Sequence, residues 1–285
     1  MSVSGRPDPF ASGLAWPEAP RWRNGRLWIS DVWNFRLVSI GESGAVHPVA
    51  EIEGRPSGMD FEADGRICLA TGVGRQILSV DPQTGEVSVI HDIGANATGF
   101  LNDMILGPEG WGWVGDTGFL FGQEDPVQTG KIFAHHPDHG FKVVATELFF
   151  PNGMVITPDG KTLYVCETFG KSILKFEIAA DGRLTNRRVH AVLPGSPDGL
   201  CMDDAGCLWV PLLFDHAFVR LSPEGKVIKR LEFPGKNAIA CVFGGEDRKD
   251  LYLCVAAIDN SDPDNIKRFG EIYRLRPGVA GAGRP

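Results

Sequence analysis

The chain has 285 residues, of which 43% are hydrophobic and 22% are charged, and its formal net charge is −8. This length fits one propeller or barrel domain, or two ordinary domains, and the composition excludes global disorder. The acidic balance argues against nucleic-acid binding, which calls for a basic surface, and no apolar run reaches the length of a membrane-spanning helix.

The N-terminus and the cysteines bear on the cellular compartment. Residues 1–10 lack the apolar stretch of a signal peptide, so we expect a cytoplasmic protein that binds neither membranes nor nucleic acid. The six cysteines form no Cys-x-x-Cys pair, and most lie within apolar runs. We therefore expect buried, free thiols rather than disulfides.

Short β-rich runs recur along the chain, and no helical period of ten or more residues is evident. Gly and Pro make up roughly a fifth of the chain and are spread evenly between the runs. Many short strands with regular turn signals predict an all-β fold. In chain order the runs are Leu27–Ser30, Ile67–Ala70, Trp113–Asp116, Leu163–Cys166, Leu208–Pro211 and Leu251–Cys254.

The runs belong to an internal repeat of about 47 residues. Each repeat reads as a loop, an apolar strand, a turn, a second apolar strand and a more polar hairpin, which is typical of a propeller blade. Six repeats predict a six-bladed β-propeller that occupies residues 1–285 as one domain. The last repeat ends on the strand Glu271–Leu275, so we expect N-terminal residues to complete its blade. Residues of about 1–10 and 278–285 are expected to be frayed. An open solenoid is the alternative, but it would need polar caps.

One position recurs nine to eleven residues before each apolar run, and in a propeller these positions should ring one mouth of the central channel. In four repeats the position holds a carboxylate or an amide. Such residues also favour turns, but two carboxylates and two amides at equivalent positions favour a site for Ca²⁺. The six positions are Glu18, Ser57, Asn102, Asn152, Asp198 and Ala240, of which Glu18, Asn102, Asn152 and Asp198 are the expected metal ligands.

We therefore expect one divalent metal ion as the cofactor. Ca²⁺ is the first expectation, with Zn²⁺, Mn²⁺ and Mg²⁺ as alternatives. The absence of Cys and His from the six positions argues against zinc.

Several short motifs surround these positions. They are Glu18-Ala-Pro-Arg-Trp22, Asn102-Asp103, Phe150-Pro-Asn-Gly153 before Thr157-Pro-Asp-Gly-Lys161, Pro197-Asp-Gly199 and Cys241-Val-Phe-Gly-Gly245. Together they resemble the senescence-marker-protein (regucalcin)/gluconolactonase family, over nearly the whole chain. The resemblance implies a six-bladed propeller with a divalent metal, often calcium, in its channel. It also implies metal roles for Glu18, Asn152 and Asp198, and a substrate or metal role for Asn102.

One departure from the family concerns the substrate. Sugar lactonases of this family carry an arginine two residues before the Asn-Asp pair, where this chain has Phe100. Neighbouring segments are also apolar, so we expect Phe100, Phe119 and Phe121 to contact the substrate together with Asn102. This favours a relatively apolar lactone or ester over a sugar lactone. The alternative is that these phenylalanines pack between blades.

The expected activity is metal-dependent hydrolysis of a small-molecule lactone or a related ester. The metal would polarise the carbonyl for attack by water, and Asp198 is the candidate general base, with His216 as a second candidate. Direct attack by a carboxylate is an alternative. Two other classes stay open: a non-catalytic propeller that binds calcium or a partner, and a lyase or synthase resembling strictosidine synthase.

Overall fold

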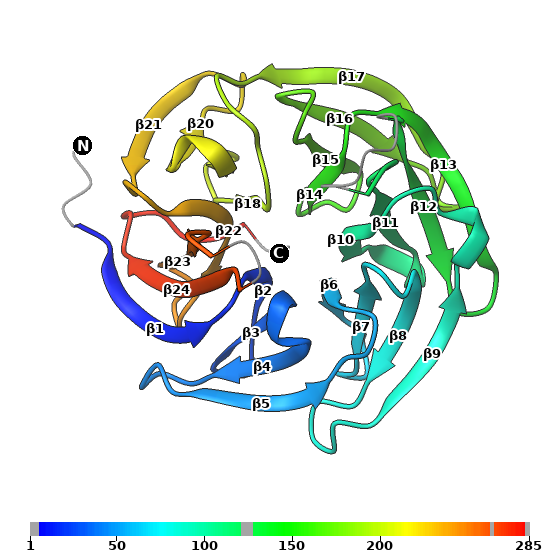
Figure 1. Cartoon of the computed structure of the whole chain (residues 1–285). Helices are drawn as coiled ribbons and strands as arrows, with labels where there is room; N and C mark the ends of the chain where they lie inside the picture. Colours follow the sequence, from blue (N-terminus) through cyan, green and yellow to red (C-terminus); the bar gives the residue numbers. More distant parts are fainter. Residues whose placement is uncertain (1–5, 121–127, 263–264, 283–285) are drawn as a thin grey trace.

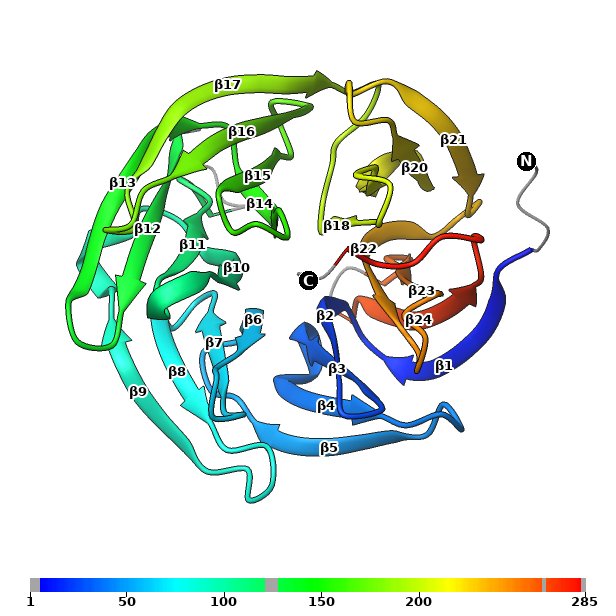
Figure 2. The same ribbon diagram turned by 180° about the vertical axis from the view of Figure 1, so that it is seen from behind.

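Six four-stranded antiparallel sheets form a ring around a central channel in the computed structural model of the protein (Figure 1). The structure describes residues 6–120, 128–262 and 265–282. The predicted six-bladed β-propeller is confirmed. In each blade the first strand lies innermost and the last strand lies at the rim, as the opposite view also shows (Figure 2).

The strands of the first three blades follow one another without crossovers. Blade one comprises β2 (Pro17–Arg23), β3 (Arg26–Asp31), β4 (Arg36–Ile40) and β5 (Val46–Glu51). Blade two comprises β6 (Pro56–Phe61), β7 (Ile67–Thr71), β8 (Gln76–Val80) and β9 (Val87–Asp92). Blade three comprises β10 (Leu101–Leu106), β11 (Gly112–Asp116), β12 (Gly130–His136) and β13 (Gly140–Leu148).

The remaining strands form blades four to six, and short 3-10 turns join some of the strands. Blade four comprises β14 (Pro151–Ile156), β15 (Thr162–Glu167), β16 (Ser172–Ile178) and β17 (Leu184–Val192). Blade five comprises β18 (Cys201–Met202), β19 (Leu208–Leu212), β20 (Ala217–Leu221) and β21 (Val227–Glu232). Blade six comprises β22 (Asn237–Gly244), β23 (Asp250–Asp259), β24 (Lys267–Leu275) and β1 (Asp8–Leu14). The 3-10 turns are η1 (Val32–Asn34), η2 (Gly94–Asn96), η3 (Pro108–Gly110) and η4 (Leu213–Asp215).

The N-terminal strand closes the ring, as the sequence predicted. β1 pairs antiparallel with β24, from Asp8 opposite Arg274 to Leu14 opposite Gly270. The predicted fraying of residues 1–10 is therefore wrong for residues 8–10, which hydrogen-bond within the sheet of blade six. Residues 1–5 lie outside the described part of the chain.

The predicted fraying of residues 278–285 is also wrong for part of that segment. The amide of Asp204 donates to the carbonyl of Ala280 at 2.8 Å, and the amide of Ala282 donates to Met202 at 2.9 Å. The Ala282 side chain packs against a core cluster of blades four and five. Backbone pairing and apolar contact thus hold the segment against blade five; residues 283–285 lie outside the described residues.

The hydrophobic core lies between adjacent blades. Six clusters of buried side chains fill these spaces among the described residues, and the largest of the fully buried side chains are Trp113 and Trp209. All six cysteines are free and buried, which confirms that expectation. Among the described residues, no helix combines the length and hydrophobicity needed to span a membrane.

A β-bulge interrupts most of the innermost strands at the position that the sequence singled out. The register shifts between Glu18 and Arg21 in β2, between Leu101 and Met104 in β10, and between Pro151 and Met154 in β14. A bulge redirects side chains and bends its strand. The candidate residues therefore turn out of the sheet toward the channel.

The glycine that follows Asn152 allows two innermost strands to approach each other closely. A Cβ atom added at Gly153 would lie 2.7 Å from the Cα atom of Gly199 and closer still to the carbonyl oxygen of Asp198. Backbone atoms cannot move aside as a flexible side chain can. In the Pro-Asn-Gly and Pro-Asp-Gly motifs, the glycine is therefore required for close packing of the backbone, and the Asn or Asp supplies a polar side chain to the channel.

We predict that Gly153→Ala destabilises the propeller by about 2–4 kcal/mol, because the added methyl group forces blades four and five apart. Chemical denaturation of both proteins measures this change. Gly41→Ala is the matched control, since its added Cβ would meet only the Arg26 side chain, at 3.5 Å. Equal stability of Gly153→Ala and Gly41→Ala would contradict the close approach.

Candidate functional site

A cavity of ≈ 510 Å³ opens among the loops that lead into the innermost strands. The structure brings the four expected metal ligands together there, because Glu18, Asn102, Asn152 and Asp198 all line it. Ser57 lines it as well. In β22, the innermost strand of blade six, Asn237 lines the cavity, whereas Ala240 does not: it is 1% exposed and bridges to Gly199. The position inferred for blade six was therefore wrong.

Asp198 and Asn152 are buried side by side in the floor of the cavity. Asp198 is 2% exposed, and its Oδ1 atom is buried without a hydrogen-bond partner among the described residues. The amide nitrogen of Asn152 donates to the Thr168 hydroxyl at 3.0 Å, and that hydroxyl donates to the carbonyl of Pro197 at 2.9 Å. This chain fixes the amide, so that its oxygen is available to a ligand. Sequence reasoning missed Thr168, which orients Asn152.

Glu18 and Asn102 are held by one side-chain contact each. The indole nitrogen of Trp16 donates to Oε1 of Glu18 at 2.9 Å, and the backbone of Ala19 also hydrogen-bonds to this carboxylate. The Ser57 hydroxyl donates to Oδ1 of Asn102 at 3.3 Å. Both residues line the cavity, Glu18 from β2 of blade one and Asn102 from β10 of blade three.

The carboxyl groups of the site repel one another. Burial raises the pKa of Asp198 well above its ordinary value, the charge of Asp103 raises it further, and the hydrogen bond from Asn152 opposes the shift. Burial and the charges of Asp198 and Asp103 likewise raise the pKa of Glu18. Asp103 has a partial counter-ion in Arg21, at 3.9 Å. The negative charges of Glu18 and Asp198 are therefore not balanced by the nearby arginine, which pairs with Asp103.

These residues fit a bound cation. The donor set holds only carboxylate and amide oxygens, which Ca²⁺ and Mg²⁺ prefer, and a cation would satisfy the buried Oδ1 of Asp198. Among the described residues, no group of three or more His, Cys, Asp and Glu side chains has metal-binding geometry. The site therefore depends on its two amides as well as on Glu18 and Asp198, and it lacks the nitrogen and sulfur ligands typical of zinc.

Buried carboxylates at the ends of second strands pin the loops that lead into the site. Asp31 accepts the amide hydrogen of Ala15 at 2.8 Å, Asp116 accepts that of Gly99 at 2.7 Å, and Glu167 accepts that of Phe149 at 2.9 Å. A buried carboxylate that accepts backbone hydrogens satisfies groups that would otherwise be costly to bury. The scaffold beneath the cavity is therefore rigid.

Aromatic and aliphatic side chains form most of the remaining cavity wall. They come from five blades, so the cavity is apolar above its oxygen-lined floor. The largest are Trp16, Trp33, Phe100, Phe150, Phe169, Leu213, Phe214, Ile258 and Ile266.

The phenylalanines that the sequence suggested as substrate contacts occupy different places in the structure. Phe100 lines the cavity, whereas Phe119 does not line it and instead packs against Phe150 and Phe169, with ring centroids 5.4 and 5.7 Å away. Phe119 thus supports two wall residues from behind. Phe121 lies outside the described residues. His216 is not a lining residue, and its Nδ1 lies 2.9 Å from the carbonyl of Lys236, which leaves Asp198 as the candidate base.

Comparison with known proteins identifies the family. The sequence profile of the SMP-30/gluconolactonase/LRE-like region matches residues 16–257. The chain belongs to this family. The resemblance seen in the short motifs is thereby confirmed, and it extends over five complete blades and part of the sixth.

Relatives in this family include named lactonases. A 6-deoxy-6-sulfogluconolactonase of Pseudomonas putida is 24% identical and a pentonolactonase of Haloferax volcanii is 26% identical. The first alignment covers 94% of this chain and 93% of the relative, and the second covers 94% and 92%. Rabbit regucalcin is 32% identical, over 51% of each chain.

Solved structures of the family share the fold. A calcium-binding protein named regucalcin, from Agrobacterium tumefaciens, superimposes with a TM-score of 0.79 at 21% identity, over 97% of this chain and 96% of its own. A gluconolactonase from Xanthomonas campestris gives a TM-score of 0.74 at 22% identity, over 96% and 97%. At sequence identities this low, the comparison shows that the propeller fold is shared and shows nothing more.

Proposed function

We propose that this protein hydrolyses lactones, or closely related esters, with a divalent metal ion held by Glu18, Asn102, Asn152 and Asp198. The observation that carries the proposal is the convergence of these oxygen donors, with a buried unpartnered Oδ1 on Asp198, at the floor of a ≈ 510 Å³ cavity. Relatives that are named lactonases support the reaction class. The calcium-binding protein with the same fold supports Ca²⁺ as the first metal to test.

The chemistry divides between the cation and the chain's own groups. A bound divalent ion supplies Lewis acidity toward the substrate carbonyl. Asp198 accepts a proton from the water that attacks the carbonyl carbon, and it returns a proton to the ring oxygen when the acyl C–O bond breaks. Ring opening then yields a hydroxy acid. Asn102 fixes the orientation of the substrate through its amide.

Direct attack by a carboxylate is the alternative route, and it predicts a covalent acyl-enzyme. Single-turnover hydrolysis in water enriched in oxygen-18 separates the two routes. Attack by water places the label in the product acid. Label in the Asp198 carboxylate, detected by mass spectrometry, would show attack by Asp198 followed by hydrolysis of the resulting anhydride at the Asp198 carboxyl carbon.

The wall of the cavity favours substrates with an apolar body. Phe100, Phe150 and Phe214 line the space above the oxygen-rich floor. Hydroxyl groups of a sugar lactone would lose hydrogen bonds to water against these rings, at a cost of about 1–3 kcal/mol each. An alkyl or aryl substituent gains about 25 cal/mol per Å² of apolar surface that it buries.

We predict that Phe100→Gln narrows the preference for apolar over sugar lactones by roughly tenfold in kcat/KM, because it exchanges apolar contact for hydrogen bonding. Glutamine is the better probe than arginine, since the guanidinium of Arg55 already lies 5.5 Å from the Phe100 ring. Ile228→Gln, at an exposed position of β21, is the control. A wild-type preference for sugar lactones would contradict the proposed wall.

A screen of lactones and esters, with and without added divalent cations, tests the proposal as a whole. Hydrolysis that requires Ca²⁺ or another divalent ion is the expected result. Binding of Ca²⁺ without turnover of any substrate would favour the non-catalytic alternative. Carbon–carbon bond formation or elimination would favour the synthase or lyase class.

A further inference from the structure

Two arginine side chains stack on one tryptophan in the cavity wall. The Cζ atom of Arg55 lies 4.1 Å from the ring centroid of Trp33, and that of Arg268 lies 3.8 Å away. Trp33 belongs to η1 of blade one, Arg55 precedes β6 of blade two, and Arg268 belongs to β24 of blade six. All three residues line the ≈ 510 Å³ cavity.

The positive charge of this pair is not neutralised within the described residues. Neither guanidinium takes part in the ion pairs found there, which use other arginines and lysines. The Nε atom of Arg55 is buried and has no hydrogen-bond partner in the part of the chain that the structure describes. Burial and the nearby charge of Arg268 lower the pKa of Arg55. Two cationic groups are thus held close together, which costs electrostatic free energy. The net charge of the whole chain is −8, so this local positive charge is unusual.

The backbone at Arg55 is arranged to place this side chain in the cavity. Arg55 has a φ of 69°, in the left-handed region, and it directly precedes Pro56. For a residue other than glycine this conformation costs about 1 kcal/mol or more, and such residues cluster at functional sites. The carbonyl of Arg55 accepts the amide of Gly72 at 2.8 Å, which holds the turn.

The same position in other blades also supplies cavity residues. Phe150 precedes Pro151 with a φ of 64°, and Trp16 precedes Pro17; both line the cavity. These residues form a second layer next to the oxygen donors. Among Trp16, Arg55 and Phe150, only the blade-two residue carries a charge.

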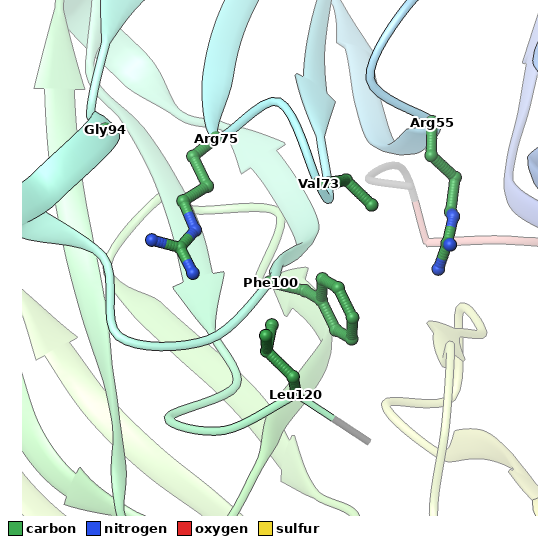
Figure 3. Close-up of a pocket in the computed structure, with 6 residues that line it drawn as sticks. All are labelled: Arg55, Val73, Arg75, Gly94, Phe100 and Leu120. Atoms are coloured by element: carbon green, nitrogen blue, oxygen red, sulfur yellow. The ribbon is translucent and has the colours of Figure 1, made fainter. Parts of the chain in front are cut away.

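A second cavity adjoins the main one and is also lined by arginine. A cavity of ≈ 370 Å³ shares Arg55 and Phe100 with the main one and is also lined by Arg75. Figure 3 shows Arg55 and Arg75 on opposite sides of Phe100. A third arginine, Arg75, therefore lines the cavity that adjoins the stacked pair.

We propose that Arg55 and Arg268 bind an oxyanion, a carboxylate or a sulfonate, that the substrate carries apart from its reacting ester bond. This inference rests on the proposed lactone hydrolysis and names its substrate class: a lactone with an apolar body and one anionic group. Guanidinium groups suit this role because their planar donors match the two oxygens of a carboxylate. Stacking on Trp33 fixes the guanidinium planes before the ligand arrives.

The first experiment compares matched substrates. A neutral aryl γ-lactone is measured beside its counterparts that carry a carboxylate or a sulfonate on the aryl ring, each with Ca²⁺ present. Because charge-assisted hydrogen bonds contribute about 1.5–3 kcal/mol, we expect a roughly 10- to 100-fold higher kcat/KM for the better anionic lactone. The preference should fall as salt is added. The carboxylate and sulfonate arms identify which oxyanion the site accepts.

Two variants and a control assign the preference to the pair. Arg268→Gln should reduce the ratio of anionic to neutral kcat/KM about tenfold, and Arg268→Lys should retain part of it. Arg188→Gln, on the exposed face of β17, removes the same charge at a distance and should leave the ratio unchanged. If the stacked arginines only hold blades together, Arg268→Gln will lower thermal stability and affect both substrates equally, which overturns the proposal.

Calorimetric binding separates this inference from the proposed function. The corresponding lactams, which resist hydrolysis, are titrated into the wild type and Arg268→Gln. If no lactone is hydrolysed but the anionic lactam binds the wild type more tightly than the variant, the anion site stands and the lactonase proposal fails. If lactones are hydrolysed and neutral and anionic lactams bind equally, the lactonase proposal stands and the anion site is wrong.

Discussion

Asp198→Asn is expected to lower kcat about a thousandfold at saturating metal, because an amide cannot accept the proton of the attacking water. The substitution preserves the shape of the side chain and keeps one oxygen at the cavity floor. The affinity for Ca²⁺ should also fall, since one of the two carboxylates that line the site is lost. Initial rates across a Ca²⁺ titration separate the two effects.

The same variant should be more stable than the wild type when both are free of metal. Asp198 is 2% exposed, and its carboxyl is repelled by that of Asp103. Replacing a buried, uncompensated charge by an amide should raise the melting temperature by several degrees. Asp204→Asn, at an exposed position near the same blade's second strand, is the control for both measurements. Wild-type kcat in Asp198→Asn would exclude Asp198 as the base.

Removal of divalent metal is expected to abolish hydrolysis, with a loss of about a thousandfold, since Lewis acid stabilisation of the carbonyl oxygen contributes several kcal/mol. The folded protein should also lose stability. Ca²⁺ at a thousand times its Kd stabilises the native state by about 4 kcal/mol. In a chain of this size that corresponds to a melting temperature about 7 °C above that of the chelated protein.

A panel of cations completes this test. Because the donors are oxygens without His or Cys, we expect Ca²⁺ and Mg²⁺ to be the most effective ions of the panel, which also includes Mn²⁺ and Zn²⁺. The double variant Glu18→Gln with Asp198→Asn should lose most of the metal-dependent stabilisation and serves as the negative control. A melting temperature that is indifferent to both Ca²⁺ and chelator would contradict a metal site at these residues.

The fold could be predicted from the sequence because each blade contains its own local pattern of strands and turns. A turn, two apolar runs and a polar hairpin recur six times, and such local features need no knowledge of distant contacts. The repeat also located Glu18, Asn102, Asn152 and Asp198, because equivalent positions of a propeller share one face of the ring. The exceptions were the ends, because residues 8–10 and 280–282 lie outside the repeated pattern but pair with blades six and five.

The residues that form the upper wall of the cavity could not be predicted from the sequence alone. Arg55 and Arg268 lie in different blades, and only closure of the ring, by β1 against β24, brings both to Trp33. Phe119 belongs to an apolar segment like that of Phe100, yet it packs behind the wall and Phe100 forms it. One sequence signal was available, since Arg55 precedes a proline as Trp16 and Phe150 do.

The sequence by itself thus determined the architecture of this protein and the four polar residues that meet in its cavity, because both follow from a pattern that each repeat carries locally. The tertiary structure alone decided which side chains share the cavity wall, since their distances depend on how six separate sheets pack around the axis. Asn237 illustrates this: it enters the cavity in place of Ala240 because β22 runs past Gly199 of the neighbouring blade. A count of residues along the chain contains no information about that contact.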